Sequence, residues 1–184
     1  MGFLDKILKN NEIHEDNKKI KQTNIDLELR LNSIYERIIN YGHYCDVYDA
    51  VNDERIENFS NEIYKKLNVI VPEEYKILLK KTNGIYFGNG TYILNIDEII
   101  DKTISFKNMM EDWEIGRIPQ EFMLISEYHD GQGYVFWYSK LQKYIIVDYL
   151  VDCELDDIAS LKTVDNLYDV IEYLEEEFKE VFKL

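Results

Sequence analysis

Residues 71–84 read VPEEYKILLKKTNG and predict a short helix with a defined beginning and end. Pro72 stands at the first helical position, where its missing N–H leaves no hydrogen bond unmade. Glu73 and Glu74 follow in the first turn, where carboxylates favour the positive end of the helix dipole. Asn83-Gly84 ends the helix, because glycine readily adopts the left-handed conformation that follows a helix. Apolar residues before this stretch recur at helical spacing, and those after it form strand-like runs.

Two further helices are predicted on the N-terminal side. One apolar stripe, with successive spacings of four, three, four and three residues, contains Leu27, Leu31, Ile34, Ile38 and Tyr41. A helix that begins near Asn24 and ends at Gly42 would bury that stripe. The second helix covers residues 53–68 and buries Ile56, Phe59, Ile63 and Leu67. For residues 1–23, a short amphipathic helix and a frayed terminus are both open.

Strands dominate after Gly84. They are predicted at residues 85–87, 91–94, 122–127, 133–138 and 144–149, and helical segments at 97–101, 105–113 and 165–182. Short turns join the strands into hairpins and an antiparallel meander. Because the order is helices, then strands, then a helix, without βαβ alternation, the sequence predicts an α+β fold. We expect a mainly antiparallel sheet with helices packed against one side of it, plus an N-terminal helical extension.

The charge favours a basic protein as the partner. The 184 residues include 36 acidic and 21 basic side chains, which gives a net charge of −15. This charge repels the phosphates of nucleic acids and the surface of anionic membranes, and it attracts basic proteins. We therefore expect no direct contact with nucleic acid and none with a membrane.

The expected location is the cytoplasm. No apolar run approaches the roughly 18 residues that a membrane-spanning helix needs. The first residues carry charges inside their apolar stretch, unlike a secretory signal. Cys45 and Cys153 favour two free thiols in a reducing compartment, and a single bridge between them is the alternative.

The sequence contains no cofactor-binding or metal-binding motif with the required residues at the required spacing. Residues 88–93 read GNGTYI, with isoleucine where a dinucleotide-binding fingerprint has its third glycine. Asp152, Glu154 and Asp156 alternate as at the start of an EF-hand loop, but Asp157 stands where that loop requires glycine. The three histidines have no paired-ligand spacing. We therefore expect no cofactor and no bound metal.

One group of residues is a candidate for acid–base chemistry. Glu127, His129 and Asp130 follow a predicted strand, and polar residues in a loop are a mild functional hint. No nucleophile, oxyanion donor or cofactor loop accompanies them in the sequence. We therefore expect no enzymatic activity and no catalytic residues.

The strand at residues 133–138 is rich in aromatic residues. Alternation places Tyr134, Phe136 and Tyr138 on one face, and Val135 and Trp137 on the other. One face must belong to the core. The other is either covered by a helix or an exposed aromatic surface for a partner, and both alternatives are open.

These segments together resemble the SMI1/KNR4 family, also called the SUKH superfamily. The resemblance rests on the helix of residues 71–84, the meander of residues 122–149, the segment Glu98-Ile99-Ile100 and the closing helix of residues 167–178. It covers residues 53–184, and it leaves residues 1–52 as an N-terminal helical extension. Two local features depart from the family pattern. Ile85 stands where a second glycine is common, and residues 126–130 replace a glycine-centred turn.

The resemblance implies a binding module without catalytic residues. Bacterial members of the family look mostly like immunity proteins, each of which neutralises a cognate toxin such as a nuclease, and fungal relatives are linked to regulation of cell-wall synthesis. We therefore expect a non-enzymatic immunity protein that binds a basic toxin. The alternative is a regulatory scaffold of the cell-wall-regulator kind.

The expected contact surface lies in the acidic C-terminal part of the chain. Residues 148–184 hold 12 acids and 3 lysines, although most of residues 172–180 would form the solvated face of the last helix. The candidate partner-binding residues are Asp152, Glu154, Asp156, Asp157, Tyr128, His129, Asp130 and Trp137. The acidic loop of residues 152–157 is the preferred contact patch.

Overall fold

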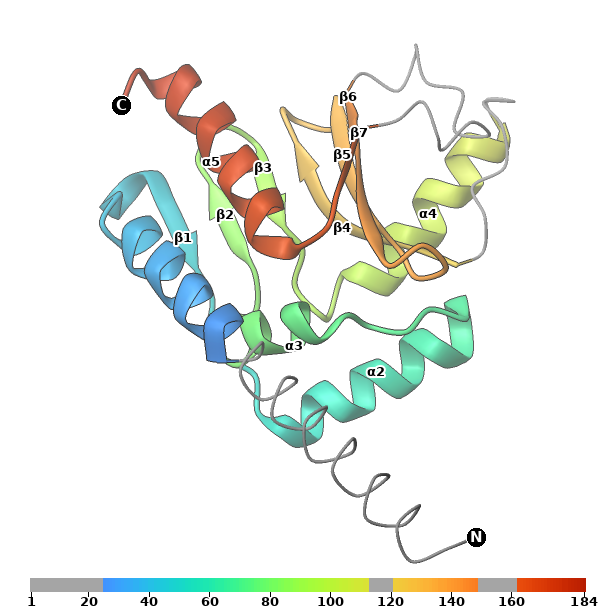
Figure 1. Ribbon diagram of the computed structural model, residues 1–184. Coiled ribbons are helices and arrows are strands. Elements are labelled where there is room, and N and C mark those ends of the chain that lie inside the picture. Colours follow the sequence, from blue (N-terminus) through green and yellow to red (C-terminus); the bar gives the residue numbers. More distant parts are fainter. Residues whose placement is uncertain (1–24, 113–120, 149–161) are drawn as a thin grey trace, which may run out of the picture.

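The computed structural model describes residues 25–112, 121–148 and 162–184 (Figure 1). Its centre is a seven-stranded antiparallel sheet whose strands neighbour one another in chain order. The strands are β1 (Cys45–Val47), β2 (Ile85–Phe87), β3 (Thr91–Ile93), β4 (Phe122–Tyr128), β5 (Gly133–Tyr138), β6 (Lys143–Asp148) and β7 (Lys162–Val164). The predicted α+β class is confirmed.

The helices surround this sheet. They are a helix over residues 25–39, the 3-10 turn η1 (Gly42–Tyr44), α2 (Asp53–Leu67), α3 (Glu73–Leu79), α4 (Ile99–Asp112) and α5 (Leu167–Phe182). In α4, the sequence predicted two separate segments where the structure has one helix. The predicted gap contains Thr103, whose buried hydroxyl donates to the carbonyl of Ile99 and accepts the N–H of Leu124. None of the helices in the described residues is long and apolar enough to span a membrane.

Asparagine side chains fix the start of two helices. Asn52 accepts the N–H of Arg55 at the start of α2, and Asn166 accepts the N–H of Asp169 at the start of α5. Each side chain satisfies one of the backbone donors that a helix leaves free in its first turn. The closing helix therefore begins at Leu167, two residues later than predicted.

One face of the sheet packs on α4. Phe106 of α4 contacts Tyr134 and Phe136 of β5, with ring centroids 4.6 and 5.0 Å apart. Side chains of a strand alternate between faces, so Val135 and Trp137 point to the other side.

That second face packs on α5 and the helix over residues 25–39. Phe178 of α5 contacts Phe87 of β2 at 5.6 Å and Tyr41, beyond the end of the first helix, at 5.2 Å. Leu31, Ile34 and Ile38 of the first helix belong to the same buried core. The expectation that helices lie on one side only is therefore wrong. The cause is β5, whose two faces are both apolar and both need cover.

The N-terminal extension contributes a strand as well as a helix. Residues 45–47 form β1, which pairs antiparallel with β2 at the edge of the sheet. Sequence alone predicted only helix before residue 53. A pattern of three residues is too short to predict a strand from sequence. The strand β1 is defined by its pairing with β2.

Candidate functional site

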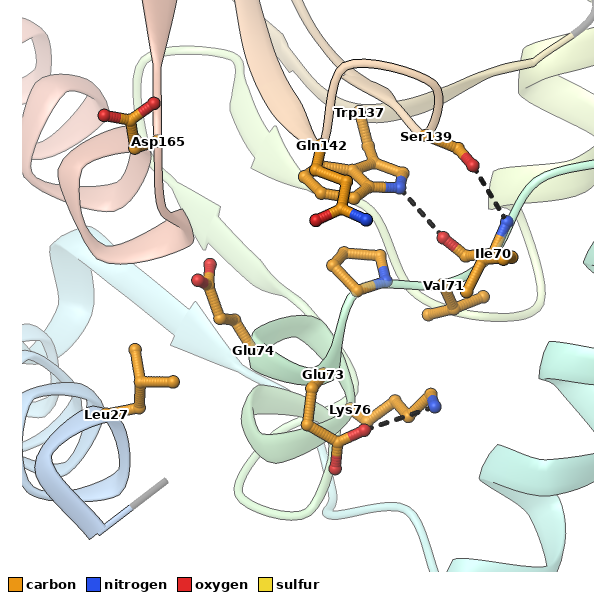
Figure 2. Close-up of a pocket in the computed structure, with 11 residues that line it drawn as sticks. Leu27, Ile70, Val71, Glu73, Glu74, Lys76, Trp137, Ser139, Gln142 and Asp165 are labelled. Atoms are coloured by element: carbon orange, nitrogen blue, oxygen red, sulfur yellow. Dashed lines mark hydrogen bonds and ion pairs between the residues drawn. The ribbon is translucent and has the colours of Figure 1, made fainter. Parts of the chain in front are cut away.

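A pocket of about 400 Å³ opens where the beginning of α3 meets the β5–β6 turn (Figure 2). The helix over residues 25–39 and the segment before α5 complete its wall. Its lining residues are Leu27, Ile70, Val71, Pro72, Glu73, Glu74, Lys76, Trp137, Ser139, Gln142 and Asp165. Residues 71–84 supply five of them, so the stretch that begins α3 also shapes this pocket.

Trp137 forms an inner wall of this pocket. Its indole N–H donates to the carbonyl of Ile70 at 2.9 Å, and its ring lies 4.9 Å from the ring of Tyr144. Only 7% of Trp137 is exposed. The alternative of an exposed aromatic surface on this side of β5 is therefore wrong. The segment that leads into α3 covers Trp137, which leaves it no open face for a partner.

Glu74 connects the pocket to α5. Its Oε2 atom accepts the N–H of Leu167 at 2.5 Å and the hydroxyl of Tyr144 at 3.3 Å. Burial raises the pKa of Glu74, and these two hydrogen bonds lower it without cancelling the effect. This carboxylate holds the first turn of α5 in place. The pocket thus has carboxylates at its rim, which suit a cationic side chain of a partner.

The β4–β5 turn holds two of the predicted contact residues. His129 and Asp130 have positive φ angles of 51° and 54°, as in a tight hairpin turn. The Nε2 atom of His129 lies 2.9 Å from a carboxylate oxygen of Glu177 on α5. Asp130 is exposed beside the neighbouring β2–β3 turn, where its N–H donates to the carbonyl of Gly90.

Tyr128 lies inside the protein. It is 2% exposed, its hydroxyl donates to the carbonyl of Val147, and its ring meets Tyr173 of α5 edge-on. A Cβ atom at Gly133 would lie 2.1 Å from this ring, which explains why glycine occupies the start of β5. The structure therefore places the side chain of this predicted contact residue in the interior.

The acid–base candidates are not gathered into one site. Glu127 forms an ion pair with Lys102 of α4 at 2.5 Å, on the α4 face of the sheet. His129 instead pairs with α5, on the opposite face. The preferred contact patch, with Asp152, Glu154, Asp156 and Asp157, lies outside the described residues, as does Cys153.

An ion pair between the partly exposed Arg37 and the buried Glu175 joins the first helix to the last. Arg37 makes a bidentate contact with Glu175, with distances of 2.6 and 2.8 Å, and Tyr41 donates to the same carboxylate at 2.5 Å. The side chain of Glu175 is only 1% exposed. Sequence reasoning assigned most acids of residues 172–180 to the solvated face and did not single out Glu175 as a buried one. A usable signal was present, since Glu175 stands four residues after Ile171 and three before Phe178 in the buried stripe.

Cys45 is a free thiol on β1. Burial, followed by the charges of Asp46 and Glu175, raises its pKa to about 12. At pH 8 its reactive thiolate is therefore roughly a thousandfold scarcer than that of an ordinary cysteine. In a Cys153→Ser background, we expect iodoacetamide to label the native protein at least about a hundredfold more slowly than the protein in urea. Equal rates in the two states would contradict the burial of this thiol.

One family of known proteins matches this chain. A family model described as SMI1-KNR4 cell-wall matches residues 53–169. The match begins at the first residue of α2 and ends inside α5, so the first helix and β1 lie outside it. No curated protein matches the chain.

Proposed function

From the premise that this chain belongs to the SMI1/KNR4 (SUKH) family, we propose that it is a non-enzymatic immunity protein. It binds a cognate protein toxin of basic character, such as a nuclease, and neutralises it in the cytoplasm by occupying its surface. The role requires no cofactor, no metal and no catalytic residue of this chain.

The observation that carries the proposal is the charge of α5. This helix contains six acidic residues and one lysine. Glu172 and Glu176 have side-chain exposures of 54% and 72%, so their charge faces solvent. Through Glu177 and His129 the acidic surface continues to the β4–β5 turn. A basic toxin would be steered to such a surface, which would also compete with phosphates for the toxin's cationic groups.

The test begins with the protein encoded beside this chain's gene. We expect the two products to co-purify after co-expression, and the association rate to fall about tenfold or more between 50 and 500 mM salt. The variant E172Q/E176Q/E180Q should lower the association rate about tenfold at low salt. Its matched control, E54Q/E57Q/E62Q, removes the same number of charges from α2 and should leave the rate within about twofold.

A regulatory scaffold is the second candidate, favoured by the words "cell-wall" in the description of the matching family. A scaffold that recruits partners through its N-terminus should lose recruitment when residues 1–23 are deleted. Neutralisation of a toxin by the folded domain should survive that deletion. Absence of a toxin-like neighbour, together with lost recruitment, would favour the scaffold over the immunity protein.

A further inference from the structure

Four side chains form one row across the first four strands of the sheet. Asp46 pairs with Tyr86, Tyr86 with Tyr92, and Tyr92 with Glu127. Directly paired residues of antiparallel strands point to the same face. The next member of the row is Tyr134, whose ring packs on α4, and this fixes the row on the α4 face. We call Asp46, Tyr86, Tyr92 and Glu127 the tyrosine row.

α4 covers only part of that face. It lies at the end of the sheet formed by β4–β6, whereas β1 and β2 lie at the other end (Figure 1). Tyr134, beneath α4, is 8% exposed, but Tyr86 and Tyr92 are both partly exposed. Their rings stack with centroids 4.8 Å apart and planes 30° apart. The tyrosine row therefore presents a partly exposed aromatic surface.

The chain's own Lys102 shows how this surface holds a cation. Its ammonium lies 2.5 Å from a carboxylate oxygen of Glu127 and 5.8 Å from the ring centroid of Tyr92. A ring face and a neighbouring carboxylate thus share one positive charge. At the other end of the row, Asp46 and Tyr86 repeat this pair of groups. Asp46 is exposed and, within the part of the chain that the structure describes, has no ion-pair partner.

We propose that the tyrosine row is a docking surface for an arginine of a basic protein partner. The guanidinium stacks on Tyr86 and donates hydrogen bonds to Asp46, parallel to the arrangement of Lys102 with Tyr92 and Glu127. This inference rests on the proposed function, since the immunity protein's toxin is the source of the basic segment. Asp46 belongs to β1, outside the residues that match the family model, so the N-terminal extension completes the surface.

The chemistry favours arginine over lysine and over nucleic acid. A guanidinium is planar, stacks on aromatic rings and binds a carboxylate through two N–H groups, whereas an ammonium is a strongly hydrated point charge. Exposed tyrosines can also stack on bases, but such sites combine the rings with cations that hold the phosphates. Here Asp46 and the nearby Asp130 supply negative charge, and Lys102 is already paired with Glu127. Burial, followed by the charges of its neighbours Tyr86 and Asp130, raises the pKa of Tyr92.

The first experiment measures affinity for the co-expressed toxin. We expect Y86L/Y92L, which keeps apolar side chains on the strands, to weaken binding by about tenfold to a hundredfold. Y64L, which changes an exposed tyrosine of α2, should change it less than about twofold. Because Y86L/Y92L could fail to fold, D46K provides a second variant at an exposed position. It should weaken binding about tenfold or more, and the matched reversal E57K on α2 should not.

A second experiment separates this inference from the proposed function. Tetra-arginine amide, titrated into the wild-type protein, should shift the NMR ring signals of Tyr86 and Tyr92 more than that of Tyr64, and tetra-lysine amide should shift them less. Toxin binding that Y86L/Y92L and D46K leave unchanged would overturn the docking surface but not the immunity function. If the wild type binds no toxin, the immunity function fails and the peptide still tests the surface. If the ring signals of Tyr86 and Tyr92 do not shift with the arginine peptide, or shift with oligo(dT) instead, the proposed docking surface is wrong.

Discussion

Arg37→Ala should lower the free energy of unfolding by about 3–5 kcal/mol at pH 7.5. The variant leaves the carboxylate of Glu175, which is 1% exposed, without its bidentate partner. Tyr41 and Lys179, at 2.5 and 3.4 Å, remain close to it but do not replace two charged hydrogen bonds. Urea denaturation of wild type and variant measures the difference.

The size of this loss should depend on pH. Burial by itself raises the pKa of Glu175, but the hydrogen bonds from Arg37 and Tyr41 and the charges of Arg37 and Lys179 outweigh it, so the pKa is lowered. In the wild type, the stabilisation is therefore present above the unfolded pKa of about 4.3 and is lost as the pH falls through the lower folded value. In Arg37→Ala, the pKa of Glu175 should be higher than in the wild type, because the hydrogen bond and charge of Arg37 are lost while burial remains, so protonation in mild acid should relieve part of the cost. The loss at pH 5 should be smaller than that at pH 7.5.

Two comparisons make the prediction specific. Lys66→Ala removes an exposed i,i+4 pair with Glu62 and should cost no more than about 0.5 kcal/mol. The double variant Arg37→Met with Glu175→Leu removes both charges and should recover most of the loss, because no buried charge is left unpaired. A loss below about 1 kcal/mol for Arg37→Ala, or one independent of pH, would contradict the dependence of the buried Glu175 on Arg37.

Trp137→Ala should lower the free energy of unfolding by about 3–5 kcal/mol. The substitution removes the indole ring that forms the inner wall of the pocket, and with it the contact with Tyr144. It also leaves the carbonyl of Ile70 without the indole N–H that it accepts at 2.9 Å. Thermal and urea denaturation give the loss.

Trp137→Phe separates packing from hydrogen bonding at this position. It keeps an aromatic ring but loses the N–H, and should cost about 1–3 kcal/mol. Partner affinity, measured on the folded fraction of each variant, should change little for Trp137→Phe. A fully stable Trp137→Ala protein that no longer binds its partner would restore Trp137 as a contact residue and contradict its place in the interior.

Residues 71–84 show what local sequence can predict. Proline and two acids predict the start of a helix through backbone rules that act within a few residues, and α3 lies inside the predicted stretch. Its ends differ from the prediction: Pro72 is the N-cap in an extended conformation, not the first helical residue, and the helix ends at Leu79, before Asn83-Gly84. Periodicity likewise predicted α2, α5 and the β4–β6 meander. The same periodicity could not reveal that Glu74 of this helix would accept the N–H of Leu167, because that contact joins residues 93 positions apart.

The incorrect predictions also concern contacts between residues far apart in the sequence. Arg37 and Glu175 are 138 residues apart, and neither arginine nor glutamate is a residue type that predicts a buried side chain. Trp137 and Tyr128 were predicted as contact residues because aromatic side chains are common in interfaces. Aromatic side chains are equally common in protein cores. His129 and Asp130 were placed correctly in a turn, and the sequence could not show that the turn would rest against α5 and the β2–β3 hairpin.

The chain-order arrangement of the sheet has a consequence for synthesis on the ribosome. Each strand from β2 to β7 pairs with the strand made immediately before it, so every new strand finds its partner already outside the exit tunnel. The β2–β3, β4–β5 and β5–β6 hairpins close only short loops, which favours rapid assembly, whereas the β1–β2 and β3–β4 pairings close the longer segments of residues 48–84 and 94–121. The first helix, by contrast, must wait for nearly the whole chain, because the partner of Arg37 lies in the last helix to be translated. A nascent chain cut before α5 would therefore have its strands paired while its first helix still lacked its anchor.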